Sequence, residues 1–287
     1  MSSELIVIVG PTASGKTQLA IDVAKRIGGK IICADSRTVY RELDIGTAKP
    51  TAENLSTIPH YGINLVDPDQ KYSLYDFIAE AKSKVEYIKQ RGKIPILVGG
   101  SGLYVDGVLF NYQLNSEVDT EKRAELESLS VEQLIDYCKN NYIQLPDNFL
   151  NKRYLIRTIE QRGVNNRSDR TIQENIIVVG ISTPREDLNR RIERRVRDMF
   201  DEGVIEEAKK VASKYGWQLE AMKGNVYQAI NQYCRGDIDL ASAIHQAIVH
   251  DHQLVKKQMT WFRRDPFIVW GQSDELLEYI SYRNSRL

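Results

Sequence analysis

One stretch near the N-terminus, GPTASGKT at residues 10–17, constrains the fold of this chain more than any other. It matches every fixed position of the phosphate-binding pattern G-x-x-x-x-G-K-[S/T]. A short apolar run at residues 5–9 precedes it, and residues 16–27 have the composition of a helix that ends at Gly28. A strand, this loop and a helix in that order predict an α/β core of the P-loop NTPase type.

Further apolar runs predict the rest of a sheet. Residues 30–34 (KIICA), 94–98 (IPILV) and 175–181 (NIIVVGI) have the composition of buried strands. Residues 74–90 have helical composition, and Ser73 followed by Asp76 is the sequence pattern of a capping box at the start of that helix. Strands that are apolar throughout and alternate with helices predict a parallel sheet with helices on both faces.

The interval at residues 112–173 has helical patterns and no strand signal. It predicts an all-helical insertion domain within a core formed by residues 1–111 and 174–287. From residue 184 on, the chain is helical again. Two apolar stripes are expected to face the core there: Leu188, Ile192, Val196 and Met199 in the first helix, and Ile244, Ile248, Val255, Met259 and Phe262 in residues 240–262.

Charge is balanced over the whole chain, with 39 lysines and arginines against 39 aspartates and glutamates. This balance argues against a protein that coats nucleic acid indiscriminately. Basic residues nevertheless gather in three runs, at residues 152–170, 185–197 and 252–264. A single run of this kind is typical of a solvated helix face, but three together favour an acidic polymer as partner.

Other classes of protein fit the sequence poorly. Its apolar runs are far shorter than the roughly 20 residues that a membrane helix needs, and a signal-peptide pattern is absent, so we expect a cytoplasmic protein. The three cysteines lie far apart and are expected to be reduced. His245, His250 and His252 fall close together, but the neighbouring sequence lacks the further ligands that a zinc site needs.

The phosphate-loop pattern also predicts how its ligand is bound. Backbone N–H groups from Ala13 to Lys16 are expected to face phosphate oxygens at the helix N-terminus, with the Lys16 ammonium as a point charge. The Thr17 hydroxyl is the expected ligand of Mg²⁺, the cofactor that the pattern predicts. The loop therefore predicts a diphosphate or a triphosphate, and it leaves the reaction open.

Ligands of open parallel sheets bind beyond the carboxyl ends of the strands. Asp35 directly follows the second expected strand, and Ser101 follows the third, so both are expected near the phosphate loop. From position alone, a functional role and a helix-capping or turn role are equally consistent with each residue. Asp67, in the run YGINLVDPD, resembles a Walker B carboxylate, but Asp-Pro-Asp favours a turn.

Several longer segments resemble one family, the tRNA dimethylallyltransferases, also called tRNA isopentenyltransferases. They are GPTASGKT, then ADSRTVYRELDIGTAKP at residues 34–50, LVGGSGLY at 97–104 and QLVKKQMTWFR at 253–263. The run at residues 35–50 is far more specific than the phosphate loop. The resemblance extends over nearly the whole chain, with weaker similarity at residues 151–160 and 185–208.

The resemblance implies prenylation of the exocyclic N6 amine of the adenosine next to the anticodon, with dimethylallyl diphosphate as the donor and the tRNA anticodon stem-loop as the partner. It implies a monomer without membrane contact. Catalysis is assigned to Asp35, Ser101 and Lys16. Donor binding is assigned to Gly10, Thr12, Ala13, Ser14, Gly15, Lys16, Thr17 and Lys223. Binding of tRNA is assigned to Asp35, Ser36, Arg37, Thr38, Ser101, Arg123, Arg153, Tyr154, Leu155, Ile156 and Arg157.

The chain departs from the family's usual pattern at four positions. Lys223 stands at a usual arginine, Val226 at a usual glycine, and His252 and Lys257 at positions that are commonly arginine. Lysine keeps the charge of arginine but loses its two-pronged recognition of phosphate. Two other functions remain consistent with the phosphate loop: a nucleoside or nucleotide kinase, and an RNA-binding module controlled by a nucleoside triphosphate.

Overall fold

The computed structural model describes residues 4–112, 120–160 and 171–286. The chain divides into two compact units. The first comprises Met1–Leu109 and Ile172–Leu287, and the second, inserted into it, comprises Phe110–Thr171. These borders differ by two residues from those expected at 112 and 173. We call the two parts the α/β unit and the helical unit.

The α/β unit is built on a six-stranded sheet in the order β3-β2-β4-β1-β5-β6, with every pair of neighbours parallel. The four strands expected from the sequence are present. The two edge strands were not expected, because runs of two and three residues are too short to show a strand pattern. The strands are β1 (Leu5–Val9), β2 (Lys30–Cys33), β3 (His60–Tyr61), β4 (Pro95–Gly99), β5 (Ile176–Ile181) and β6 (Val269–Gly271).

The strand register aligns the loops that matter for function. Val9 at the end of β1 pairs with Gly99 at the end of β4, and Cys33 at the end of β2 pairs with Val98. The loops that follow these strands therefore leave the sheet at the same edge. This is the carboxyl edge, at which parallel sheets bind their ligands.

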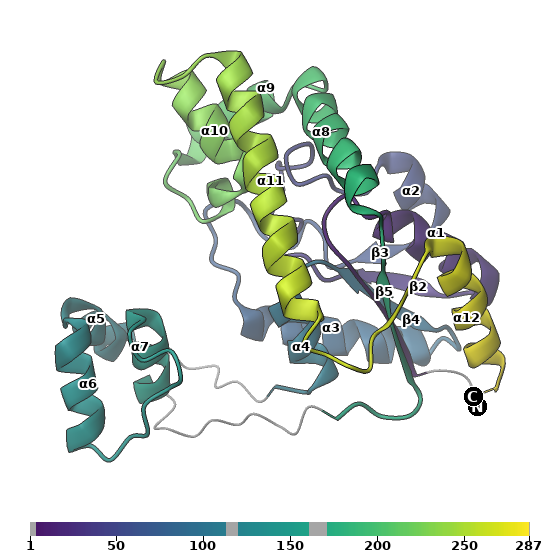
Figure 1. Cartoon of the computed structure of the whole chain (residues 1–287), viewed down its shortest axis with the longest axis horizontal. Helices are drawn as coiled ribbons and strands as arrows, with labels where there is room; N and C mark the ends of the chain where they lie inside the picture. The colour runs from purple at the N-terminus through teal and green to yellow at the C-terminus, as the bar shows by residue number, and fades with distance from the viewer. Residues whose placement is uncertain (1–3, 113–119, 161–170, 287) are drawn as a thin grey trace. The chain divides into compact units, whose positions relative to one another are not determined.

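Helices cover both faces of the sheet, as the apolar strands predict (Figure 1). Helices α1 (Lys16–Ile27) and α12 (Ser273–Arg286) pack together on one face and share a core with β1 and β5. Helices α3 (Leu74–Lys89) and α4 (Gly102–Leu109) lie on the other face. The expected capping box is present, because the Ser73 and Asp76 side chains each bond the other's backbone N–H.

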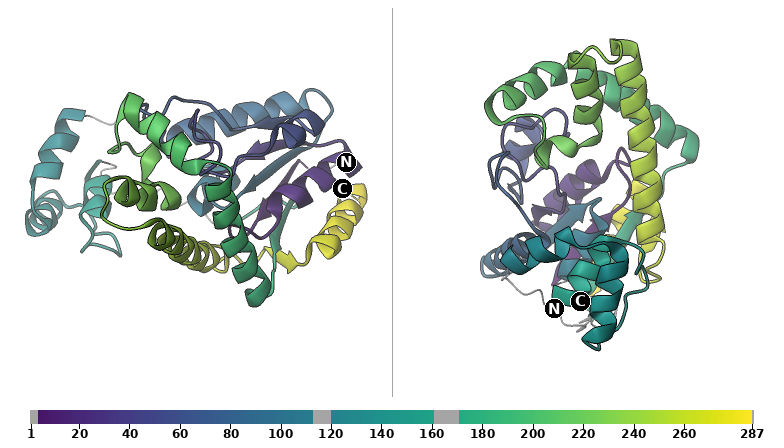
Figure 2. Two further views of the ribbon diagram at one scale, coloured as in Figure 1. Left: turned by 90° about the horizontal axis from the view of Figure 1, so that it is seen from above. Right: turned by 90° about the vertical axis from the view of Figure 1, so that its left-hand side faces the viewer.

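A group of helices lies over the carboxyl edge: α8 (Arg185–Asp201), α9 (Val204–Tyr215), α10 (Asn225–Cys234) and the long α11 (Leu240–Phe262) (Figure 2). A short 3₁₀ helix, Ala221–Lys223, precedes α10. The helices enclose a second apolar core, to which Val39 and Leu43 of the α/β unit contribute from the loop after β2. Another short helix, α2 (Ala52–Thr57), leads from this loop into β3.

The apolar stripes predicted for α8 and α11 agree with the buried residues of these helices to different extents. In α8 the expected stripe is buried as predicted, from Leu188 to Met199. In α11 the predicted stripe is confirmed in part: Phe262 is buried, and Ile244 and Ile248 pack partly buried against the second core. The other buried residues of α11, Ala243, Ala247 and Asp251, were not in the predicted stripe. A search for large apolar residues misses these three positions, because two are alanines and the third is an aspartate.

The helical unit consists of α5 (Thr120–Ser128), α6 (Val131–Asn140) and α7 (Lys152–Glu160). Helix α6 begins with a capping box formed by Ser130 and Gln133. The three helices share a small core of six buried side chains: Leu126, Leu134, Cys138, Leu155, Ile156 and Ile159. This core gives the insertion a folded structure of its own.

Three further observations concern residues 4–112, 120–160 and 171–286. None of their helices is both long and apolar enough to span a membrane. No group of three or more His, Cys, Asp and Glu side chains in them is arranged to hold a metal ion. Cys33, Cys138 and Cys234 are all free thiols.

Candidate functional site

A cavity of about 520 Å³ lies at the carboxyl edge of the sheet in the α/β unit. Its walls come from the phosphate loop, the turn after β2, the turn between β4 and α4, and helices α8, α10 and α11. Five cationic side chains line it, against two carboxylates: Lys16, Arg37, Arg195, Lys223 and Lys257, against Asp35 and Asp251. The excess of positive charge suits an anionic ligand.

The phosphate loop has the backbone of an anion cradle. Gly10 and Gly15 have positive φ angles of 151° and 97°, and Ala13 has a φ of 59°. A Cβ on Gly10 would come within 3.0 Å of the Ser14 hydroxyl oxygen, so the loop can close this tightly only with glycine there. Helix α1 begins directly after Gly15 without a side-chain cap, which leaves its first N–H groups available to an anion.

Two N–H groups of the loop have partners within the protein. The Ser14 N–H, which belongs to the stretch expected to face the ligand, donates to the Pro11 carbonyl oxygen at 3.3 Å. The Thr12 N–H donates to Oε1 of Gln258 at 2.8 Å. The buried Ser14 hydroxyl oxygen, in contrast, has no hydrogen-bond partner within the described residues.

Lys16 lies at the centre of the charge arrangement. Its ammonium group donates to the Pro11 carbonyl oxygen and lines the cavity. Desolvation by the surrounding protein lowers the pKa of Lys16 to about 8, the Asp35 carboxylate opposes this shift, and the Arg195 guanidinium adds to it. Lys16 is therefore mostly charged at pH 7, and a bound anion would favour its charged form further.

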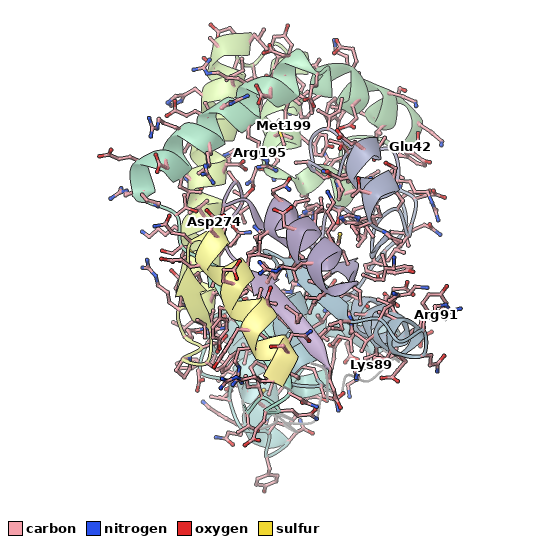
Figure 3. All side chains as sticks on the ribbon, turned by 90° about the vertical axis from the view of Figure 1, so that its right-hand side faces the viewer. Glu42, Lys89, Arg91, Arg195, Met199 and Asp274 are labelled. Atoms are coloured by element: carbon pink, nitrogen blue, oxygen red, sulfur yellow. The ribbon has the colours of Figure 1, made fainter. Side chains whose placement is uncertain are left out.

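Two arginines of α8, the helix over the carboxyl edge of the sheet, extend towards the site. An Arg191 Nη1–H donates to the Ser14 carbonyl oxygen at 3.4 Å. Arg195, one turn later, pairs with the buried Asp251 carboxylate at 2.7 Å, and Asn225 donates to the other oxygen of that carboxylate at 2.9 Å. Figure 3 shows Arg195 and Met199 on the side of α8 that faces the sheet.

These arginines were missed from the sequence. The basic run at residues 185–197 was interpreted only as a solvated helix face or as one of three runs that favour an acidic partner. The four-residue spacing of Arg191 and Arg195 is the signal that places both on one side of a helix. No separate signal in the sequence pointed to Gln258, whose side chain accepts the Thr12 N–H and donates to the Gly100 carbonyl oxygen at 3.1 Å. It therefore joins the phosphate loop to the turn after β4.

Asp35 lies in the turn after β2 and lines the cavity together with Lys16, as expected. Its Oδ1 accepts the Arg37 backbone N–H at 2.8 Å. The hydroxyl oxygen of Ser101 accepts the Ser36 N–H at 3.1 Å. Gly99 allows this approach of the two turns, because a Cβ there would lie 1.9 Å from the Ala34 carbonyl oxygen. The Asp35 carboxylate is thus held by a hydrogen bond within its own turn, and that turn is held by Ser101 from the neighbouring turn after β4.

The neighbours of Asp35 differ in what they can contact. Ser36 and Arg37 line the cavity, and Arg37 donates to the Glu220 carbonyl oxygen at 2.6 Å. The Thr38 side chain is buried and is not among the cavity residues, and its assignment as a tRNA contact stays a prediction. Lys223 lines the cavity, although its ammonium group pairs with the Glu220 carboxylate at 2.9 Å.

The helical unit contains the other residues assigned to tRNA binding. Arg123 pairs with Glu127 at 3.3 Å and with Glu160 at 3.6 Å. Leu155 and Ile156 are buried in the core of the unit, so their side chains face inward, and their assignment as tRNA contacts stays a prediction. The side chains of Arg153, Tyr154 and Arg157 are exposed.

Asp67 forms a turn, as favoured from the sequence. Its backbone carbonyl accepts the Gln70 N–H at 3.0 Å, and its carboxylate pairs with Arg41 at 2.9 Å. It is not among the residues that line the cavity. Asp67 is thus a turn residue whose carboxylate is used in an ion pair.

The comparisons with known proteins agree on one family. The family model described as IPP transferase matches residues 38–265, and one described as isopentenyl transferase matches residues 3–64. The chain is 38% identical over 271 residues to a tRNA dimethylallyltransferase of Streptococcus mutans serotype c, covering 92% of this chain and 90% of that protein. It is 33% identical over 309 residues to one of Staphylococcus haemolyticus, covering 98% and 93%.

A solved structure agrees as well. The full-length tRNA isopentenylpyrophosphate transferase of Bacillus halodurans superimposes with a TM-score of 0.76 at 33% sequence identity. The match covers 98% of this chain and 97% of that one. The likeness therefore extends through both units and does not stop at the phosphate-binding core.

Proposed function

Because the chain belongs to the family of IPP transferases, we propose that it transfers a dimethylallyl group from dimethylallyl diphosphate to the N6 amine of the adenosine next to the anticodon in tRNA. The observation that carries this proposal is the presence of Lys16 and Asp35 in one cavity. One end of the site is built for a diphosphate, and the other offers a carboxylate that can accept a proton.

The donor half of the reaction is assigned to the phosphate loop. The bond between the diphosphate oxygen and the allylic carbon breaks, and its electrons leave with the diphosphate. Negative charge therefore grows on the leaving group in the transition state. The N–H groups at the start of α1 and the Lys16 ammonium stabilise that charge, and Arg195 adds a second cation that lines the same cavity.

The acceptor half is assigned to Asp35. The N6 amine of adenine is a poor nucleophile because its lone pair is delocalised into the ring. A carboxylate that accepts an N6 proton as the new N–C bond forms lowers this barrier. The hydrogen bonds of Asp35 Oδ1 with Arg37 and of Ser36 with Ser101 hold the carboxylate in place for this task. Ser101 acts here as a positioning residue.

Mg²⁺ is the proposed cofactor. The Thr17 side chain, in the first turn of α1, is exposed to solvent beside the cavity residue Lys16. Mg²⁺ usually keeps several waters and takes few protein ligands besides the phosphates of its substrate, so one hydroxyl fits its requirements. When bound, Mg²⁺ would neutralise charge on the diphosphate.

The RNA is proposed to bind through its phosphates and through the displaced base. The target adenosine must leave its stack to reach a cavity at the sheet edge. Exposed basic residues of the helical unit, Arg153 and Arg157, suit phosphate contacts, and Tyr154 between them suits a base or a ribose. We propose that the enzyme acts as a monomer.

The test compares two labelled donors with an unmodified tRNA that carries adenosine after its anticodon. Dimethylallyl diphosphate labelled in the prenyl group is expected to transfer its label to RNA, and nucleoside analysis is expected to find N6-dimethylallyladenosine. ATP labelled at the γ-phosphate is expected to transfer nothing. Transfer of the γ-phosphate without prenylation would establish a kinase instead, and tRNA binding without either product would favour a binding module.

A further inference from the structure

The loop at residues 44–47 forms a wall of the cavity that the proposed chemistry does not use. Gly46 and Thr47 line the cavity from this loop, beside Tyr227 of α10. Eight residues, 36–43, connect Asp35 to this loop, and the loop belongs to the most specific of the family-like segments. The contacts that hold this loop in place therefore determine the shape of this wall of the cavity.

A single carboxylate, that of Glu207 in α9, holds the backbone of this loop. Its Oε2 accepts the N–H groups of Asp44 at 2.6 Å and of Ile45 at 2.8 Å. Its Oε1 accepts the Gly46 N–H at 3.0 Å. Three successive backbone donors on one ionised acceptor are charge-assisted hydrogen bonds, which are stronger than bonds between neutral groups.

Tyr227 completes the arrangement. Its hydroxyl donates to Oε1 of Glu207 at 2.7 Å, and its ring is almost fully buried. Burial and the charge of Glu207 raise the pKa of Tyr227, so the phenol stays protonated and remains a donor. A Cβ on Gly46 would lie 2.5 Å from both Cζ and the hydroxyl oxygen of Tyr227, so the loop can approach this ring only with glycine there.

A second set of contacts holds the remainder of the loop. The buried ammonium group of Lys49 donates to the carboxylate of Asp44 at 2.6 Å and to the side-chain carbonyl of Asn64 at 2.7 Å. The Thr47 hydroxyl donates to the Leu43 carbonyl oxygen at 2.6 Å. The loop is thus fixed from both ends, and Glu207 is the partner from outside it that holds its centre.

We propose that Glu207 is a positioning residue that, with Tyr227, shapes the part of the cavity that receives the acceptor adenosine. This inference rests on the proposed function. The loop continues from the turn that holds Asp35, whereas the donor diphosphate is assigned to the phosphate loop on the other side of β4. The four hydrogen bonds to Glu207 described above come from the 44–47 loop and Tyr227, and none comes from the phosphate loop.

The first test replaces Glu207→Gln and measures two affinities without turnover. Binding of an anticodon stem-loop RNA is expected to weaken by about tenfold, because one of the carboxylate's acceptor oxygens becomes an NH₂ group that opposes N–H donors. Binding of dimethylallyl diphosphate is expected to change by less than about twofold, since the phosphate loop is untouched. Glu206→Gln, an exposed neighbour on α9 with the same change in charge, is the matched control and is expected to match wild type.

Unchanged RNA affinity in Glu207→Gln, or a loss of donor affinity as large as the loss of RNA affinity, would overturn the inference. Thermal unfolding of both variants separates a local effect from a loss of fold. Because the readout is binding, it remains informative if wild type binds the RNA but forms no prenylated product, an outcome that would defeat the proposed function alone.

The second test is a double-mutant cycle on RNA binding. Tyr227→Phe removes only the hydroxyl that donates to Glu207, and it is expected to weaken RNA binding by a fewfold. Combined with Glu207→Gln, its effect is expected to be less than the product of the two single effects, because both changes disturb the same group of hydrogen bonds around this side chain. Combined with Glu206→Gln, the effects are expected to multiply. Multiplication in both pairs would contradict the role of the shared bond.

Discussion

Two loops meet at the carboxyl edge of the sheet, and they are held in place by different means. The phosphate loop takes its shape mainly from its own sequence: glycines with positive φ at residues 10 and 15, and the helix that begins directly after it. The segment from Asp35 to Lys49 depends on partners far along the chain, Ser101 for its turn and Glu207 for its centre. The donor side is thus a local motif, and the acceptor side is a product of the tertiary fold.

The largest effect is expected at the start of the acceptor segment. Asp35→Asn keeps the size of the side chain and its hydrogen bond with the Arg37 N–H but removes the base. Loss of a general base typically costs about 10²- to 10⁴-fold in rate, so we expect kcat for prenyl transfer to fall within that range. Single-turnover measurements with labelled donor check this. A variant within threefold of wild type would remove Asp35 from the chemistry.

The next effect is expected in the phosphate loop. Lys16→Ala removes a cation from the site of the leaving group, and a comparable loss of transition-state stabilisation costs about 10²- to 10³-fold. Unlike Asp35→Asn, it is also expected to weaken donor binding. Lys25→Ala, on the same helix but outside the cavity, is the control. Undiminished donor affinity in Lys16→Ala would show that the loop holds the diphosphate without this lysine.

A smaller effect is expected at the link between the two turns. Ser101→Ala removes the oxygen that accepts the Ser36 N–H and loosens the turn that holds Asp35. The cost of an unsatisfied N–H group predicts a fall in kcat of about tenfold. Ser101→Thr keeps the hydroxyl and is expected to recover most of the rate. Equal activity of the alanine and threonine variants would exclude a role for this hydrogen bond.

The smallest expected effect is the uptake of less than one proton per enzyme when the donor binds. The pKa of Lys16 is lowered to about 8, so above that pH the free enzyme carries mostly neutral Lys16. A bound diphosphate raises this pKa, because the anion favours the ammonium form. Donor affinity is therefore expected to be steady up to pH 7 and to fall as the pH rises past 8. Calorimetry at pH 9 in two buffers of different ionisation enthalpy is expected to detect proton uptake in wild type and none in Lys16→Ala.

The difference between a local motif and a segment held by distant partners also explains which features could be predicted from the sequence. The central strands, helix α1 and the cap at Ser73 follow from local patterns, and so does the place of Lys16. The burial of Leu155, Ile156 and Thr38 was not foreseen, since assigning a whole segment to RNA takes no account of which side chains face inward. Family similarity pointed to the run at residues 35–50, and only the fold reveals that Glu207 holds it.

In helix α11, hydrophobic periodicity predicted the inward residues only poorly. Its large apolar residues predicted one inward stripe, but the cavity is lined by a different set of α11 residues: Ala247, Asp251, Leu254, Lys257, Gln258 and Trp261. Asp251 is buried there because Arg195 and Asn225 satisfy both of its oxygens. Gln258 uses its oxygen and its nitrogen on two different loops. The side chains that line a polar cavity bind the ligand and one another through polar groups. Hydrophobic periodicity, which reports burial in an apolar core, therefore does not predict which residues they are.

The most direct test of the division between a donor loop and an acceptor segment follows bound donor and product in the same samples. Wild type, Lys16→Ala and Asp35→Asn are incubated with labelled dimethylallyl diphosphate, and tRNA is then added. Asp35→Asn is expected to retain donor as wild type does and to form almost no N6-dimethylallyladenosine, whereas Lys16→Ala is expected to retain little donor. Loss of donor binding in Asp35→Asn, or undiminished product from it, would contradict the assignment of the two tasks to separate loops.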